Sequence, residues 1–259
     1  AMFGLRETQM QPWQTTGIDQ LERTGYLGAL RHLVRSHTCP IWWYDDRRAV
    51  RDAIIRGGTV TLVNTGPNTI AITAHHVYES YLRHKDECAD LKCQFGNVTV
   101  EPERYMIASD ASLDIATFGL PVVLAAATGA IPHNAPVWPP SVIQKSELVI
   151  LGGYPGNRRS ENTRTVNSDF VSFISRIGES SEDHMSIHLN LQESHWPQGK
   201  RLENSPDLGG ISGGPTFRIR TEPLETIEFA GVIYESNQSY ELVFARHASR
   251  IRSDGVLRK

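Results

Sequence analysis

The stretch DLGGISGGPTF, residues 207–217, places one serine, Ser212, among four glycines and a proline. Small residues on both sides of a hydroxyl let other backbone segments approach closely, and glycine also adopts the backbone angles of tight turns. A nucleophilic serine needs such surroundings, because neighbouring backbone N–H groups must point at the oxyanion that forms during acyl transfer. A glycine-rich surface turn between two strands has the same composition, so this stretch alone leaves both interpretations open.

Two segments upstream carry the other residue types that a nucleophilic serine requires. ITAHHV, residues 72–77, ends an apolar run with two adjacent histidines, and SLDIATF, residues 112–118, sets Asp114 in an apolar strand. The order along the chain is therefore His, Asp, Ser, which is the order in one of the convergent families of serine triads. An esterase of the α/β-hydrolase type is disfavoured, because in that fold the acid follows the serine.

Taken together, the three segments resemble the trypsin/chymotrypsin-like serine peptidases, and especially their prokaryotic, disulfide-free branch, over residues 57–248. The resemblance implies that Ser212 is the nucleophile, His76 the general base, and Asp114 the group that orients the imidazole. It further implies an oxyanion hole formed by the backbone N–H groups of Gly210 and Ser212. The implied function is a serine endopeptidase that works through an acyl-enzyme; the alternative is a protease-like module that binds a peptide or protein and has a dormant or partner-activated site.

The choice between the two histidines rests on the same motif. The family places two small or polar residues between a threonine and the catalytic histidine and an apolar residue after it, and Thr73, His76 and Val77 fit this pattern. His75 is then expected to be a packed or hydrogen-bonded neighbour. Ile211 stands where animal enzymes carry an aspartate that pairs with a freed amino terminus, which excludes activation by that ion pair.

The resemblance also implies that Asp207, Tyr234, Glu235 and Ser236 bind the substrate. The strand that contains the last three is expected to pair with an extended substrate by β-augmentation. Asp207 or Glu235 would favour a basic substrate side chain, unless either carboxylate faces solvent. Tyr234 replaces a small residue that in the family often supports the catalytic aspartate.

Composition excludes several classes of partner. The net charge of −3 comes without a lysine- or arginine-rich block, so no nucleic acid is expected, and no apolar run reaches the length of a membrane span. The three cysteines are too few and unpaired for a disulfide framework or a zinc site, and the first residues show no apolar segment typical of a signal peptide. We therefore expect a cytoplasmic protein without metal or cofactor, whose partners are a protein or peptide substrate and, as a further candidate, a regulatory protein.

Short runs of β-branched and apolar residues from Gly57 onward predict an all-β fold, which the resemblance specifies as two six-stranded antiparallel β-barrels of the chymotrypsin type. Residues 1–56 are expected to form a partly helical N-terminal extension, and residues 57–130 the first barrel with His76 and Asp114. Residues 131–145 hold four prolines in nine positions, which excludes a central strand and predicts a crossing between the barrels. Residues 146–259 would form the second barrel with Ser212.

Overall fold

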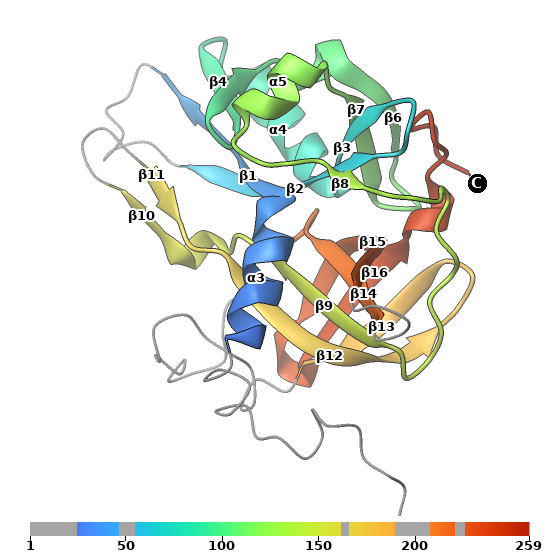
Figure 1. Ribbon diagram of the computed structural model, residues 1–259. Coiled ribbons are helices and arrows are strands. Elements are labelled where there is room, and N and C mark those ends of the chain that lie inside the picture. The colour runs from blue at the N-terminus through green and yellow to red at the C-terminus, as the bar shows by residue number, and fades with distance from the viewer. Residues whose placement is uncertain (1–24, 47–54, 162–165, 190–207, 221–225, 259) are drawn as a thin grey trace, which may run out of the picture.

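The computed structural model describes residues 25–46, 55–161, 166–189, 208–220 and 226–258. Strands predominate in this part of the chain and form two lobes, an open sheet and a closed barrel (Figure 1). The first lobe carries the predicted histidine and aspartate, and the second carries the predicted serine.

The open sheet has eight strands in the order β5-β4-β1-β2-β3-β7-β6, with β8 pairing β2 in parallel. Its centre is a hairpin, in which the β-branched β2 returns through a turn into β3, with Leu62 opposite Ala71. The strands are β1 (Thr38–Asp45), β2 (Arg56–Asn64), β3 (Thr69–Thr73), β4 (Leu91–Phe95), β5 (Val98–Val100), β6 (Met106–Asp110), β7 (Ile115–Gly119) and β8 (His133–Asn134).

This sheet differs from the six-stranded closed barrel expected for residues 57–130. Within the described residues its end strands, β5 and β6, do not pair with each other, so the sheet stays open. Strand β1 comes from the segment assigned to the N-terminal extension and lies between β2 and β4. The extra strand is built from the aromatic run after Pro40, whose Trp43 is 2% exposed, so burial of aromatic side chains favours this insertion.

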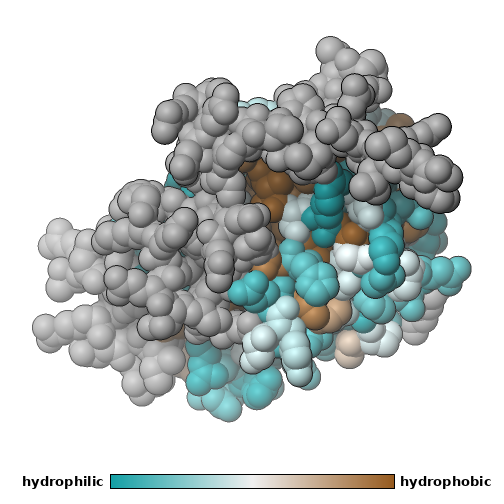
Figure 2. Space-filling model, turned by 90° about the horizontal axis from the view of Figure 1, so that it is seen from below, coloured by the Kyte–Doolittle hydropathy of each residue, from teal (hydrophilic) through white to brown (hydrophobic). Residues whose placement is uncertain are grey.

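The second lobe is a closed barrel of six antiparallel strands in the order β12-β13-β16-β15-β14-β9. Alternate side chains fill its interior, among them Leu151, Phe173 and Ile187. Viewed from this lobe, the described part of the surface shows hydrophobic side chains bordered by hydrophilic ones (Figure 2). The strands are β9 (Leu148–Gly153), β12 (Val171–Ser180), β13 (His184–His188), β14 (Pro215–Arg220), β15 (Thr226–Asn237) and β16 (Leu242–His247), beside which β10 (Arg159–Glu161) and β11 (Val166–Ser168) form a separate hairpin.

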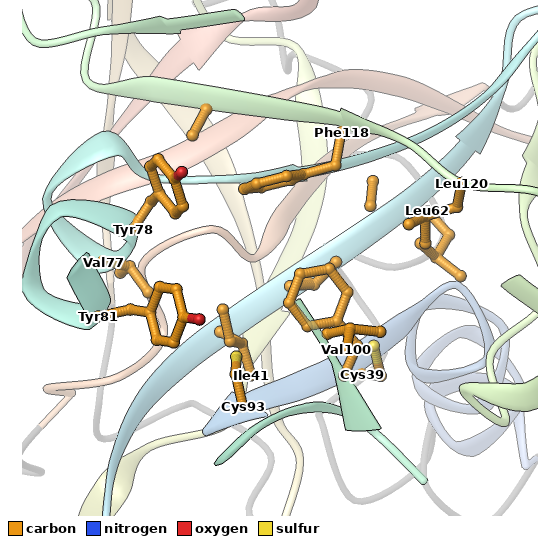
Figure 3. Packing of buried hydrophobic residues seen from close by; sticks show 14 of the residues in the cluster. Cys39, Ile41, Leu62, Val77, Tyr78, Tyr81, Cys93, Val100, Phe118 and Leu120 are labelled. Atoms are coloured by element: carbon orange, nitrogen blue, oxygen red, sulfur yellow. The ribbon is translucent and has the colours of Figure 1, made fainter. Parts of the chain in front are cut away.

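Three α-helices of the described ranges accompany the strands: α3 (Tyr26–Ser36), α4 (His75–Glu87) and α5 (Val122–Ala127). Helix α4 covers the open sheet, and its Tyr78 and Tyr81 point toward sheet residues such as Phe118 (Figure 3). The Tyr78 and Phe118 rings meet edge to face with centroids 5.4 Å apart. Helix α3 is the helical part of the extension expected over residues 1–56, as far as that segment is described. No helix in the described ranges is both long and apolar enough to cross a membrane.

One hydrophobic cluster joins the two lobes. It packs Ile72 and Ile115 of the sheet with Phe217 and Phe229 of the barrel. The proline-rich segment runs beside this junction, and its Trp138 stacks on the Phe229 ring at 6.1 Å between centroids. Because apolar burial is continuous across the junction, the ends of β3 and β14 are held side by side.

Candidate functional site

His76 is held against Asp114 by two hydrogen bonds. Strand β3 ends at Thr73, and the chain turns into α4 so that His76 is the second helical residue. Its ring Nδ1 lies 2.8 Å from Asp114 Oδ2, and its backbone N–H donates to Asp114 Oδ1, also at 2.8 Å. An ionised carboxylate can only accept, so Nδ1 carries a proton, and in the neutral form of the imidazole Nε2 is then the proton acceptor. The arrangement fixes both the tautomer and the orientation of the imidazole.

The neighbouring His75 has a different partner. Its Nδ1 lies 2.7 Å from Ser109 Oγ on strand β6. The structure therefore distinguishes the two adjacent histidines, and it pairs His76 with the aspartate.

Asp114 lies in a strained turn, at φ 52°, between β6 and β7. The turn is stabilised from within by Asp110, whose Oδ1 accepts from the backbone N–H groups of Ser112 at 2.8 Å and Leu113 at 3.0 Å. Burial alone would raise the pKa of the Asp114 carboxyl, but the two hydrogen bonds and the charge of His76 outweigh it, and the pKa lies below its ordinary value. Asp114 is therefore ionised at neutral pH.

The turn before Ser212 has a defined backbone conformation. Ile211 N–H donates to Leu208 O at 3.1 Å, and Gly210 has φ +104°, the combination typical of a type II turn. Gly209 O accepts from Gly156 N–H at 2.7 Å, so the N–H of Gly210, on the same trans peptide, points the opposite way. A Cβ at Gly210 would lie 2.8 Å from Tyr154 O, which explains the need for glycine.

Threonine hydroxyls and one backbone amide of strand β2 anchor the serine turn across the lobe junction. Thr59 Oγ1 donates to Gly210 O, and Thr61 Oγ1 donates to Gly213 O, each at 2.9 Å. Thr59 N–H donates to Ser212 O at 2.9 Å. Three carbonyls of the turn thus face the sheet, while in the described part of the chain the N–H groups of Gly210 and Ser212 have no hydrogen-bond partner.

Ser212 lies next to the histidine segment but is not bonded to it. A Cβ at Gly213 would be 2.9 Å from Thr73 Cα, three residues before His76, which shows how closely the two segments approach. Ser212 Oγ is 3.5 Å from Tyr234 O, a long hydrogen bond. Among the residues the structure describes, Ser212 Oγ makes no hydrogen bond to the His76 ring.

The predicted substrate residues fall on two segments. Asp207 lies outside the described residues. Tyr234, Glu235 and Ser236 follow one another on β15, with Glu235 exposed. Strand β14 pairs with β15 only as far as Val232, so these three residues extend beyond it, beside the serine turn. The pKa of the Tyr234 hydroxyl is raised, mainly by burial and also by the nearby carboxylates of Glu235 and Asp114. The charge of Arg246 has the opposite, smaller effect.

The histidine, aspartate and serine segments can be identified from the sequence, but the residues that support them cannot. Thr59, Thr61 and Arg246 are predicted only as parts of strands, and nothing in their spacing marks a hydroxyl or guanidinium that reaches the opposite lobe. Within the described ranges no cluster of three or more histidine, cysteine or acidic side chains is placed to hold a metal ion.

Comparisons with known proteins add little. No family model matches the chain, and no curated protein matches it. One similar solved structure is described by the words "Aromatic interactions drive the coupled folding and binding of the intrinsically disordered Sesbania mosaic virus VPg protein". It is 13% identical, with a TM-score of 0.45, over 82% of this chain and 92% of that chain. A likeness of this degree carries no functional information.

Proposed function

We propose that this protein is a serine endopeptidase with His76, Asp114 and Ser212 as its triad. Ser212 Oγ attacks the substrate carbonyl carbon while His76 Nε2 takes the hydroxyl proton; His76 then gives this proton to the leaving amine. Water hydrolyses the resulting acyl ester by the same route and regenerates Ser212. Asp114 stays ionised throughout and stabilises the imidazolium.

The observation that carries the proposal is the pairing of His76 with Asp114 beside a serine turn that presents two N–H groups unpaired within the described part of the chain. A base needs an orienting partner, and here His76 has one in the Asp114 carboxylate, at 2.8 Å. An oxyanion needs preorganised donors, and Gly210 and Ser212 have N–H groups with no partner among the described residues. A purely structural turn has no physical need for either feature.

The substrate class follows from strand β15. An extended peptide is proposed to add to residues 234–236, where β14 no longer pairs, and so to bring its scissile bond to Ser212. The fold is proposed to be a variant of the chymotrypsin type in which the first barrel has opened into a sheet.

A second candidate is a peptide-binding module whose site is dormant or activated by a partner. The position of Ser212 Oγ favours it, because the hydroxyl faces Tyr234 O at 3.5 Å rather than the His76 ring. For catalysis the hydroxyl must rotate about its Cα–Cβ bond toward Nε2, and such hydrogen bonds are often formed only in the substrate complex.

A peptide library analysed by mass spectrometry separates the two candidates. Hydrolysed amide bonds with the wild type, and none with Ser212→Ala, support the endopeptidase. Peptides retained on both proteins without hydrolysis support the binding module and overturn the endopeptidase.

A further inference from the structure

The loop that carries Asp114 is held from the opposite lobe by the side chain of Arg246 on β16. Arg246 Nε donates to Leu113 O at 2.7 Å, and its Nη2 donates to Ser112 O at 2.9 Å. Two bonds from one planar guanidinium fix both the position and the direction of the acceptors. The two acceptors are the carbonyls immediately before Asp114.

The same guanidinium lies against Tyr234. Its Cζ is 4.5 Å from the centre of the Tyr234 ring, within the range of a cation–π contact. Tyr234 also provides the carbonyl that faces Ser212 Oγ. Arg246 therefore contacts two elements of the site. Its N–H groups bind the loop that carries Asp114, and the guanidinium group packs on Tyr234 of β15, the strand beside Ser212.

Packing from the barrel supports this loop only in part. A cavity of about 300 Å³ opens beside it, lined by Asp110, Ser112, Leu113, Asp183, Arg246 and Arg250. Leu113 packs into the hydrophobic cluster that joins the lobes, but the side of the loop that faces this open pocket is not covered by the described residues, so hydrogen bonds also help to keep Asp114 in its φ 52° conformation.

We propose that Arg246 is a positioning residue, which sets the Asp114 carboxylate against His76 and couples that pairing to the substrate strand through Tyr234. The predicted effect on catalysis rests on the proposed function, whereas the predicted effect on the position of the Asp114 carboxylate does not. Loss of the guanidinium would let the loop relax and lengthen the His76–Asp114 hydrogen bonds. A misplacement of about 1 Å at a reacting group costs about 100-fold in rate.

The matched variants are Arg246→Ala, Arg246→Lys and Arg250→Ala. Lysine keeps the charge but lacks the two-pronged donor, so it is expected to be intermediate. Arg250 lines the same cavity and pairs with Asp183 instead of the Asp114 loop, so its removal is a charge-matched control.

Proton NMR gives a readout that a merely structural role would not move. The proton on His76 Nδ1 is hydrogen-bonded to the Asp114 carboxylate, so we expect it to give a downfield resonance in the wild type and in Arg250→Ala. It should broaden or disappear in Arg246→Ala and be weakened in Arg246→Lys, while the fluorophosphonate labelling rate falls about 10- to 100-fold in Arg246→Ala. If Arg246→Ala does not fold, the resonance of Arg246→Lys alone decides the test.

Failure of this inference and failure of the proposed function look different. An unchanged resonance in folded Arg246→Ala and Arg246→Lys overturns the positioning role, whatever the activity. A resonance that responds as expected in a protein that never labels supports the positioning role and contradicts the endopeptidase.

Discussion

Thr59 Oγ1 donates a hydrogen bond of 2.9 Å to the Gly210 carbonyl oxygen, across the junction between the open sheet and the barrel. The Thr59 hydroxyl oxygen also accepts from Tyr154 N–H at 2.9 Å, so one buried hydroxyl joins three segments. Because the Gly210 carbonyl is turned toward the sheet, the neighbouring peptide groups of the serine turn keep one orientation. The proposed oxyanion site is thus built partly by the lobe that does not contain the serine.

Thr59→Val tests this bridge, since valine has nearly the same shape without the hydroxyl. The buried Tyr154 N–H and the half-buried Gly210 carbonyl lose their partner, and the substitution is expected to cost about 1–3 kcal/mol of unfolding free energy. The fluorophosphonate labelling rate should fall by about 100-fold, the cost of a misplaced oxyanion donor. Chemical denaturation and labelling kinetics measure the two effects.

Thr216→Val is the matched control. Thr216 is equally buried, but its Oγ1 has no hydrogen-bond partner among the described residues, so its loss is expected to leave stability and labelling unchanged or slightly improved. Equal effects of the two substitutions would contradict the role given to Thr59.

Gly210→Ala is expected to disable the site. The residue has φ +104°, and its new Cβ would lie 2.8 Å from Tyr154 O and 2.9 Å from Gly156 N, so the turn must shift. We expect labelling to drop by about 100- to 1,000-fold. Gly66→Ala has nearly the same backbone cost, at φ +99°, but open space around its Cβ, and it should lose stability without losing labelling.

The two histidines provide a separate prediction. His76→Ala removes the proposed base and should abolish labelling, whereas His75→Ala removes a contact to Ser109 and should leave it nearly unchanged. Labelling rates of the two variants at equal protein concentration decide the matter. Retention of labelling in His76→Ala would assign the base to another group.

Sites can be predicted from the sequence where the functional residues lie in a short motif of specific composition and spacing. Contacts between residues that are distant in the sequence cannot be predicted in this way. The TAHHV and GGISGG segments can be identified because their residue types and spacing are specific. Asp110 reads as an ordinary loop residue, yet it stabilises the turn that carries Asp114. The bond from Thr59 to Gly210 spans 151 positions, and no local pattern reveals it.

The architecture of the first lobe shows the same limit. An alternating run predicts a strand but not its neighbours, so the insertion of β1 between β2 and β4 cannot be foreseen. Trp43 of β1 is 2% exposed, and only the sheet pairing places it in this lobe instead of in an extension.

A buried histidine predicts acid sensitivity of the fold. His133 is 6% exposed, and burial, with a smaller contribution from the charge of His37, lowers its pKa from 6.5 to about 4. Between these values the unfolded chain binds more protons, so stability is fully present above pH 6.5 and is lost as the pH falls toward 4. The contribution is roughly 3 kcal/mol, at about 1.36 kcal/mol per pKa unit.

Urea denaturation at several pH values measures this loss in the wild type and in His133→Leu, which cannot be protonated. The variant should lose less stability than the wild type between pH 6.5 and 4. The remaining dependence includes His37, whose pKa is also lowered by burial. Parallel stability curves for the two proteins would rule out His133 as the origin of the effect.

The nucleophilicity of Ser212 is tested most directly by intact-mass measurement after incubation with a fluorophosphonate probe, with Ser212→Ala alongside. We predict that the wild type gains the mass of one phosphonyl adduct, that peptide mapping places it on Ser212, and that the variant gains none. An unlabelled wild type, or the same adduct on Ser212→Ala, would contradict the proposal that Ser212 is an activated nucleophile.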